Sequence, residues 1–134
     1  DINVCDASAK FSMPFVSLGL VPEAGSSLLF TKLAGYHTAA KIFLTGESFS
    51  AEVARDIGLV NEVVTDVDAE IRRIAEVIAE QPPGSVLQTK ALLKSADHEK
   101  VGAVMKAEAE LFALALQSDE AREAFFKFMA KKKA

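Results

Sequence analysis

A single carboxylate, Glu23, stands where this sequence could position a general base. It follows the largely apolar run Phe15–Pro22 and precedes Gly25 and two serines that open a helical pattern. Apolar surroundings disfavour the charged form of a carboxylate, whereas the first N–H groups of a helix favour it. Opposed influences of this kind tune groups that accept and return a proton. The simpler interpretation, that Glu23 only caps the helix, stays open because acids are common in a first helical turn.

Other polar residues give weaker chemical signals. His37 and His98 lack neighbouring Cys, Asp or Glu residues at ligand spacing, so no metal site is expected. Ser26 and Ser27 lack the Gly-x-Ser-x-Gly setting of a nucleophile. We expect these two serines to satisfy helix N–H groups instead.

Bulk properties narrow the class of protein. The 134 residues are 50% hydrophobic and 25% charged, and the net charge of −4 argues against nucleic acid as the main partner. The single cysteine, Cys5, excludes an internal disulfide framework and fits a reducing compartment, either the cytoplasm or an organelle matrix. No stretch reaches the ~18 apolar residues expected of a membrane span.

The elements that must position Glu23 fall into two regions. Strand-like and helical segments alternate up to about residue 64, and Gly35, Gly46 and Gly58 end the first three helices. After residue 65 the pattern is helical throughout, with apolar stripes that call for burial against other elements or other subunits. The predicted strands are residues 2–5, 10–13 and 59–64, and the predicted helices are residues 25–34, 38–44, 51–57, 68–81, 85–96, 99–117 and 119–131.

Four motifs then point to a family. Their order and spacing resemble the enoyl-CoA hydratase/isomerase (crotonase) superfamily, and within it the Δ3,Δ2-enoyl-CoA isomerase branch. The resemblance is strong up to about Val64 and weaker beyond it. The motifs are Ala9–Pro14, Leu18–Gly25, Leu44–Gly46 and Ala51–Val64.

The resemblance implies an α/β fold. Residues 1–64 would form the end of a crotonase-type ββα spiral, and residues 65–134 a helical region for assembly and coenzyme A contact. It also implies a homotrimer or hexamer and an N-terminal half, missing from this sequence, that donates N–H groups to the thioester oxygen. We therefore expect these 134 residues alone to be inactive.

The same resemblance implies roles for individual residues. Glu23 matches the base of the isomerases, whereas Phe15 stands where hydratases carry one of their two glutamates. Phe15 and Leu18 would shape the acyl pocket, and Phe128 and Lys131 match a pair that contacts coenzyme A. Coenzyme A would enter as part of the acyl-CoA substrate, with no separate cofactor. A core Phe followed by a solvated Lys remains an equal interpretation of the last pair.

Three functions stay open at this point. The leading one is Δ3,Δ2-enoyl-CoA isomerisation through a dienolate, with Glu23 as the proton shuttle. The second is an enoyl-CoA hydratase or another crotonase-type acyl-CoA enzyme. The third, from another class, is a non-catalytic helical assembly module, which would rest on the apolar helices after residue 65.

Overall fold

Two short strand pairs join distant parts of the first region. The computed structural model describes residues 1–131. All three predicted strands are present but are shorter than expected, and the sequence did not predict β3. The pairs are β1 (Val4–Cys5) parallel to β4 (Glu62–Val63), and β2 (Lys10–Phe11) antiparallel to β3 (Phe49–Ser50).

Two asparagines join the chain just before β1 to the chain just before β4. The backbone N–H of Asn3 donates to Oδ1 of Asn61 at 2.8 Å, and Nδ2 of Asn3 donates to the Leu59 carbonyl at 3.0 Å. Next to them, the Asn61 N–H donates to the Asn3 carbonyl at 2.8 Å, so side-chain and backbone bonds together satisfy the residues just before β1 and β4. The regular ladder begins at Val4, whereas the predicted strand began at Ile2.

Three helices pack with these strands around one apolar core. They are α1 (Ser26–Ala34), α2 (Tyr36–Thr45) and α3 (Ala51–Asp56). Gly46 ends α2 in the left-handed conformation, at φ 64°, as its position predicted. The rings of Phe30 and Phe43 meet edge to face, with centroids 5.5 Å apart. The buried core consists of Phe30, Ala39, Ile42, Phe43, Phe49, Ala54 and Val60.

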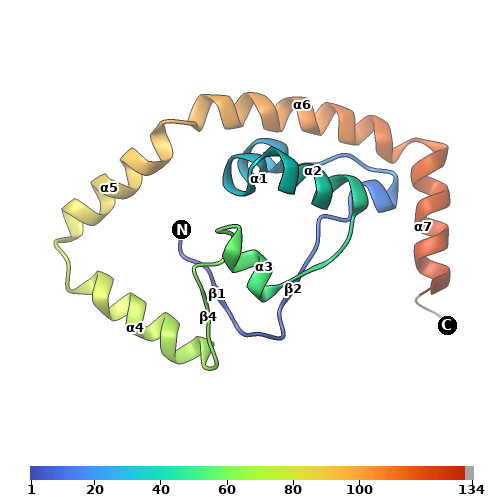
Figure 1. The fold of residues 1–134 in the computed structure, drawn as a ribbon. Helices are drawn as coiled ribbons and strands as arrows, with labels where there is room; N and C mark the ends of the chain where they lie inside the picture. Colours follow the sequence, from blue (N-terminus) through green and yellow to red (C-terminus); the bar gives the residue numbers. More distant parts are fainter. Residues whose placement is uncertain (132–134) are drawn as a thin grey trace.

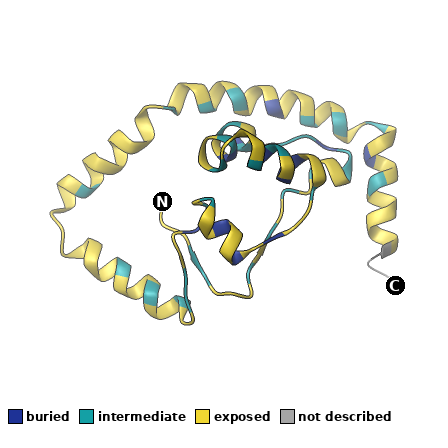
Figure 2. Ribbon diagram, in the orientation of Figure 1, coloured by how far each residue is buried: buried dark blue, intermediate teal, exposed yellow. Residues whose placement is uncertain are grey.

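Four further helices form an arc around this core (Figure 1). Most of their residues are exposed, as the yellow ribbon in Figure 2 shows. Each predicted helix is confirmed, with ends within two residues, and the predicted α/β class fits a chain in which helices outweigh strands. The four are α4 (Val67–Ala79), α5 (Pro83–Ser95), α6 (His98–Leu116) and α7 (Asp119–Lys131). None of the helices within residues 1–131 has both the length and the hydropathy of a membrane span.

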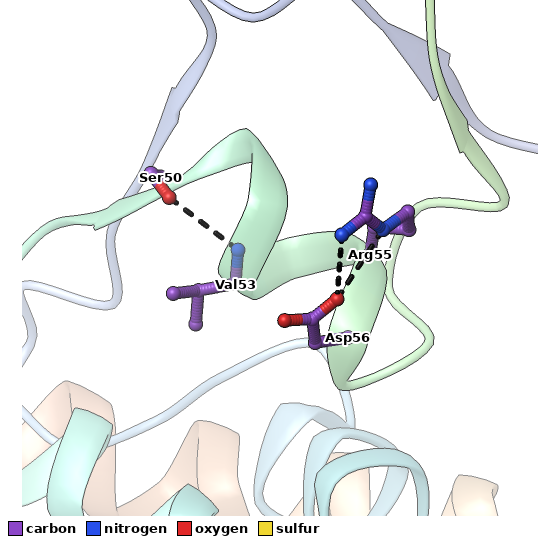
Figure 3. Close-up of polar contacts among 4 residues, drawn as sticks. All are labelled: Ser50, Val53, Arg55 and Asp56. Atoms are coloured by element: carbon purple, nitrogen blue, oxygen red, sulfur yellow. Dashed lines mark hydrogen bonds and ion pairs between the residues drawn. The ribbon is translucent and has the colours of Figure 1, made fainter.

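The N-terminus of α3 offers a test of local stability. Ser50 Oγ accepts a hydrogen bond from the Val53 N–H at 3.4 Å, as the N-cap prediction required (Figure 3). Because this bond is long, we expect Ser50→Ala to lower the free energy of unfolding by ~0.5–1 kcal/mol, at the lower end for an N-cap. Urea denaturation of the intact protein measures the change, with the exposed Ser48→Ala as the control. Equal stability of the two variants would contradict a capping role.

Candidate active site

The predicted acyl-pocket residues lie at a short 3-10 helix, η1 (Val16–Leu18): Phe15 is its N-cap residue and Leu18 its last residue. The Phe15 carbonyl accepts hydrogen bonds from the N–H groups of Leu18 at 3.0 Å and Leu20 at 2.8 Å, so it closes this turn. The Phe15 ring packs against the core, with its centroid 6.2 Å from that of Phe43. The core thus holds one side of the Phe15 ring, and Leu18 is half-buried.

The turn that follows presents Glu23 at the surface. The Ser26 N–H donates to the Glu23 carbonyl at 3.0 Å, and Ala24 and Gly25 between them have φ values of 59° and 75°. The left-handed conformation suits glycine, but it costs a residue such as Ala24 about 1–2 kcal/mol. The Glu23 side chain is exposed, so residues 1–131 do not enclose it in the apolar surroundings expected from the sequence.

The carboxylate that caps α1 is Glu108, on α6. Its side chain is only 6% exposed, and its Oε2 and Oε1 accept hydrogen bonds from the N–H groups of Gly25 at 2.6 Å and Ser27 at 2.9 Å. The N–H groups that Glu23 was suggested to cap are thus already occupied. Sequence reasoning missed Glu108, although a charged residue within an apolar helical stripe was a usable signal.

The expectation that Ser26 and Ser27 cap the helix is wrong. The N-cap position is Gly25, with no capping hydrogen bond from a side chain. Ser26 Oγ is buried and has no hydrogen-bond partner among the described residues. In place of the serines, the Glu108 carboxylate accepts from the N–H of the N-cap residue Gly25 and from that of Ser27 in the first turn.

Phe128 lies beside η1, across an open hollow. Val16, Ser17 and Phe128 line this hollow of about 420 Å³ between η1 and α7. Phe128 thus lies close to the segment of Phe15 and Leu18, but Phe15, Leu18 and Glu23 are all absent from the lining of this hollow. Lys131 is the last residue of α7, and the structure describes its backbone but not its side chain.

The histidines add nothing to this site. His37 and His98 are both exposed, on α2 and at the start of α6. Within residues 1–131, no group of three or more His, Cys, Asp or Glu side chains is placed to hold a metal ion. Between residues 16 and 27 the structure places one carboxylate, the exposed Glu23, on a turn that is hydrogen-bonded to the buried Glu108.

Comparison with known proteins identifies the family. The sequence pattern of the family described as enoyl-CoA hydratase/isomerase matches residues 1–134. The short-chain-enoyl-CoA hydratase of Clostridioides difficile is 30% identical over 130 residues, which cover 96% of this chain and 84% of that protein. The 1,2-epoxyphenylacetyl-CoA isomerase of Escherichia coli strain K12 is 32% identical over 134 residues, covering 98% of this chain and 51% of the isomerase.

A solved structure agrees with the sequence comparisons. The enoyl-CoA hydratase/isomerase from Pseudoalteromonas atlantica T6c matches this chain with a TM-score of 0.93 and 40% sequence identity, over 98% of this chain and 54% of that one. The chain thus spans about half the length of the solved protein and of the isomerase. Hydratases and isomerases both occur among the relatives. The chain belongs to the enoyl-CoA hydratase/isomerase family, a family of enzymes with the crotonase fold.

Proposed function

We propose that the intact protein is a Δ3,Δ2-enoyl-CoA isomerase in which Glu23 is the only proton carrier. The observation that carries this proposal is the contrast between two positions on one segment. Glu23 presents a carboxylate at the surface, whereas Phe15, where a hydratase glutamate would stand, has no ionisable group and packs on Phe43. A mechanism that needs two carboxylates is therefore less well supported than one that needs a single carboxylate.

The proposed reaction moves one proton. The Glu23 carboxylate removes a proton from C2 of a 3-enoyl thioester, and the electron pair shifts to give a dienolate with its charge on the thioester oxygen. The resulting carboxylic acid then returns the proton to C4, which leaves a 2-enoyl thioester and the original carboxylate. The dienolate oxygen needs preorganised N–H donors, which we assign to residues outside this sequence.

The remaining predicted residues would bind the two ends of the substrate. Phe15 and Leu18 would contact the acyl chain, and Phe128 and Lys131 the coenzyme A. Support for this assignment comes from the contact of α7 with η1, because Phe128 lines one hollow with Val16 and Ser17, which lie between Phe15 and Leu18 in the chain. Coenzyme A belongs to the substrate, so no separate cofactor is proposed.

Assembly into a trimer or hexamer belongs to the same proposal. Leu92 and Leu93 on α5, and Leu114 on α6, are each more than 60% exposed. Apolar side chains at this density are typical of surfaces that other subunits or other parts of the protein cover. A reducing compartment would suit the single Cys5.

Hydration of a 2-enoyl-CoA is the second candidate. Its support is the name of the Clostridioides difficile relative, a short-chain-enoyl-CoA hydratase. Hydration requires a carboxylate that orients and activates water, and Phe15 removes one such group from the family position. The two candidates therefore differ in which substrate the intact protein turns over faster.

Measuring both reactions with the intact protein tests the proposal. General acid–base catalysis contributes roughly 10²–10⁴ to a rate. We therefore expect turnover of a 3-enoyl-CoA to exceed hydration of the matching 2-enoyl-CoA by about 10² or more. Phe15→Glu is the companion variant, and we expect it to raise hydration relative to isomerisation. Hydration as fast as isomerisation in the unmodified protein would refute the proposal.

A further inference from the structure

The buried face of α6 contains one charged residue at its centre. The non-exposed positions of this helix follow one another at intervals of three and four residues, as a single packed stripe requires. Four of the five are Val, Phe or Ala, and the middle one is Glu108. The stripe consists of Val101, Val104, Glu108, Phe112 and Ala115.

The contacts of Glu108 explain why a carboxylate is tolerated there. Burying a charged group is unfavourable unless hydrogen bonds replace its water. Both oxygens of Glu108 are used, one by the Gly25 N–H and the other by the Ser27 N–H. These donors lie 83 and 81 residues away in sequence, so the contact joins α6 to the start of α1. A Cβ added at Gly25 would also lie 3.4 Å from Met105 and Val101, which places α6 directly on this turn.

The turn held in this way carries Glu23. Gly25 is two residues after Glu23, and Ala24 between them has a φ of 59°, which non-glycine residues seldom adopt. Such a conformation persists only where the surrounding structure determines it. The hydrogen bond from Gly25 to Glu108 fixes the peptide unit that directly follows Ala24. Relaxation of Ala24 would move both Gly25 and the Glu23 side chain.

We propose that Glu108 is a positioning residue for the isomerisation. Its buried carboxylate holds the Glu23–Gly25 turn in its left-handed conformation and so sets where the Glu23 carboxylate meets the substrate. The inference rests on the proposed role of Glu23 as the base. It assigns to Glu108 no contact with substrate and no transfer of a proton.

Replacing Glu108 by glutamine in the intact protein tests this role. Glutamine keeps one acceptor oxygen but places an NH₂ group against the second N–H donor. A catalytic group misplaced by ~1 Å costs roughly 10²-fold in rate, so we expect kcat for a 3-enoyl-CoA to fall about 10- to 100-fold. KM should stay nearly unchanged, because Glu108 does not contact the acyl-CoA. Glu110→Gln, an exposed position on the same helix, is the matched control and should keep full activity.

A second substitution separates positioning from general loss of structure. Ala24→Gly removes the strain of the positive φ, so in the Glu108→Gln background it should recover part of the lost kcat. An unchanged kcat in Glu108→Gln, or no recovery in the double variant, would overturn the inference. If Glu108→Gln does not fold, Ala24→Val tests the turn with Glu108 in place, since a β-branched residue resists φ > 0. That variant should show the same fall in kcat at constant KM, and an unchanged kcat would again overturn the inference.

Glu23→Gln, measured in parallel, tells the two proposals apart. Full turnover in Glu23→Gln would refute the proposed function, whatever Glu108→Gln does. Loss of turnover in Glu23→Gln together with full kcat in Glu108→Gln would refute only the positioning role. The amide resonances of Gly25 and Ser27 give a readout independent of activity. Both resonances should shift in Glu108→Gln, because in the unmodified protein each of these N–H groups donates to a carboxylate oxygen.

Discussion

Glu23→Gln in the intact protein should nearly abolish double-bond isomerisation while acyl-CoA binding stays almost unchanged. Glutamine keeps the size and polarity of the side chain but cannot accept a proton from C2 and return it to C4. A positioned general base contributes roughly 10²–10⁴ to a rate, so we expect kcat/KM to fall by about that factor. Turnover of a 3-enoyl-CoA, with binding of a non-reactive acyl-CoA measured alongside, checks the prediction.

The structure argues against the alternative that Glu23 is only a helix cap. Glu108 already accepts the hydrogen bonds of the Gly25 and Ser27 N–H groups, and the Glu23 side chain is exposed. The melting temperature of Glu23→Gln should therefore match that of the unmodified protein. Glu47→Gln, at another exposed glutamate, is the control for a change of charge alone. Turnover near the unmodified level in Glu23→Gln would end the case for Glu23 as the base.

Local sequence signals were sufficient for most of the helices. A cap or stop residue acts on the few residues around it, so it can be recognised without knowing the rest of the fold. Ser50 caps α3 and Gly46 ends α2, as predicted. At α5 the prediction began at Ser85, but the helix begins at Pro83, because proline is well suited to a first helical position.

The missed features depend on contacts between distant residues. Strand β3 is two residues long and depends on its pairing with β2, where Phe11 lies opposite Phe49 with ring centroids 5.7 Å apart. The bond from Gly25 to Glu108 spans 83 residues. Helical spacing could have grouped Glu108 with Val101 and Val104, but it would not have told which donors the carboxylate meets. The sequence thus pointed to the turn as the candidate site, but not to the side chain that holds it.

The close approach of α7 to η1 is a second long-range contact with a functional consequence. A Cβ added at Gly19 would lie 2.7 Å from the backbone nitrogen and 2.8 Å from the Cα of Ala121, which is fully buried. Both atoms belong to the backbone, so no side-chain rotation can make room. This contact keeps α7, and Phe128 on it, beside the segment that carries Phe15 and Leu18. The hollow between η1 and α7 therefore depends on the absence of a side chain at Gly19.

Gly19→Ala should accordingly be among the most destabilising single changes in this chain. The left-handed φ of 68° costs alanine about 1–2 kcal/mol, and overpacking against the α7 backbone about 1–3 kcal/mol more. We expect a total loss of about 2–5 kcal/mol in the free energy of unfolding, faster hydrogen exchange in α7, and weaker acyl-CoA binding.

Gly58→Ala is the matched control, because its φ of 80° brings a similar strain while the nearest atom, Cδ1 of Leu33, is 3.6 Å away. That control should lose only about 1–2 kcal/mol and leave hydrogen exchange in α7 unchanged. Equal losses in the two variants, with the same exchange in α7, would show that the contact with Ala121 does not hold the helix in place.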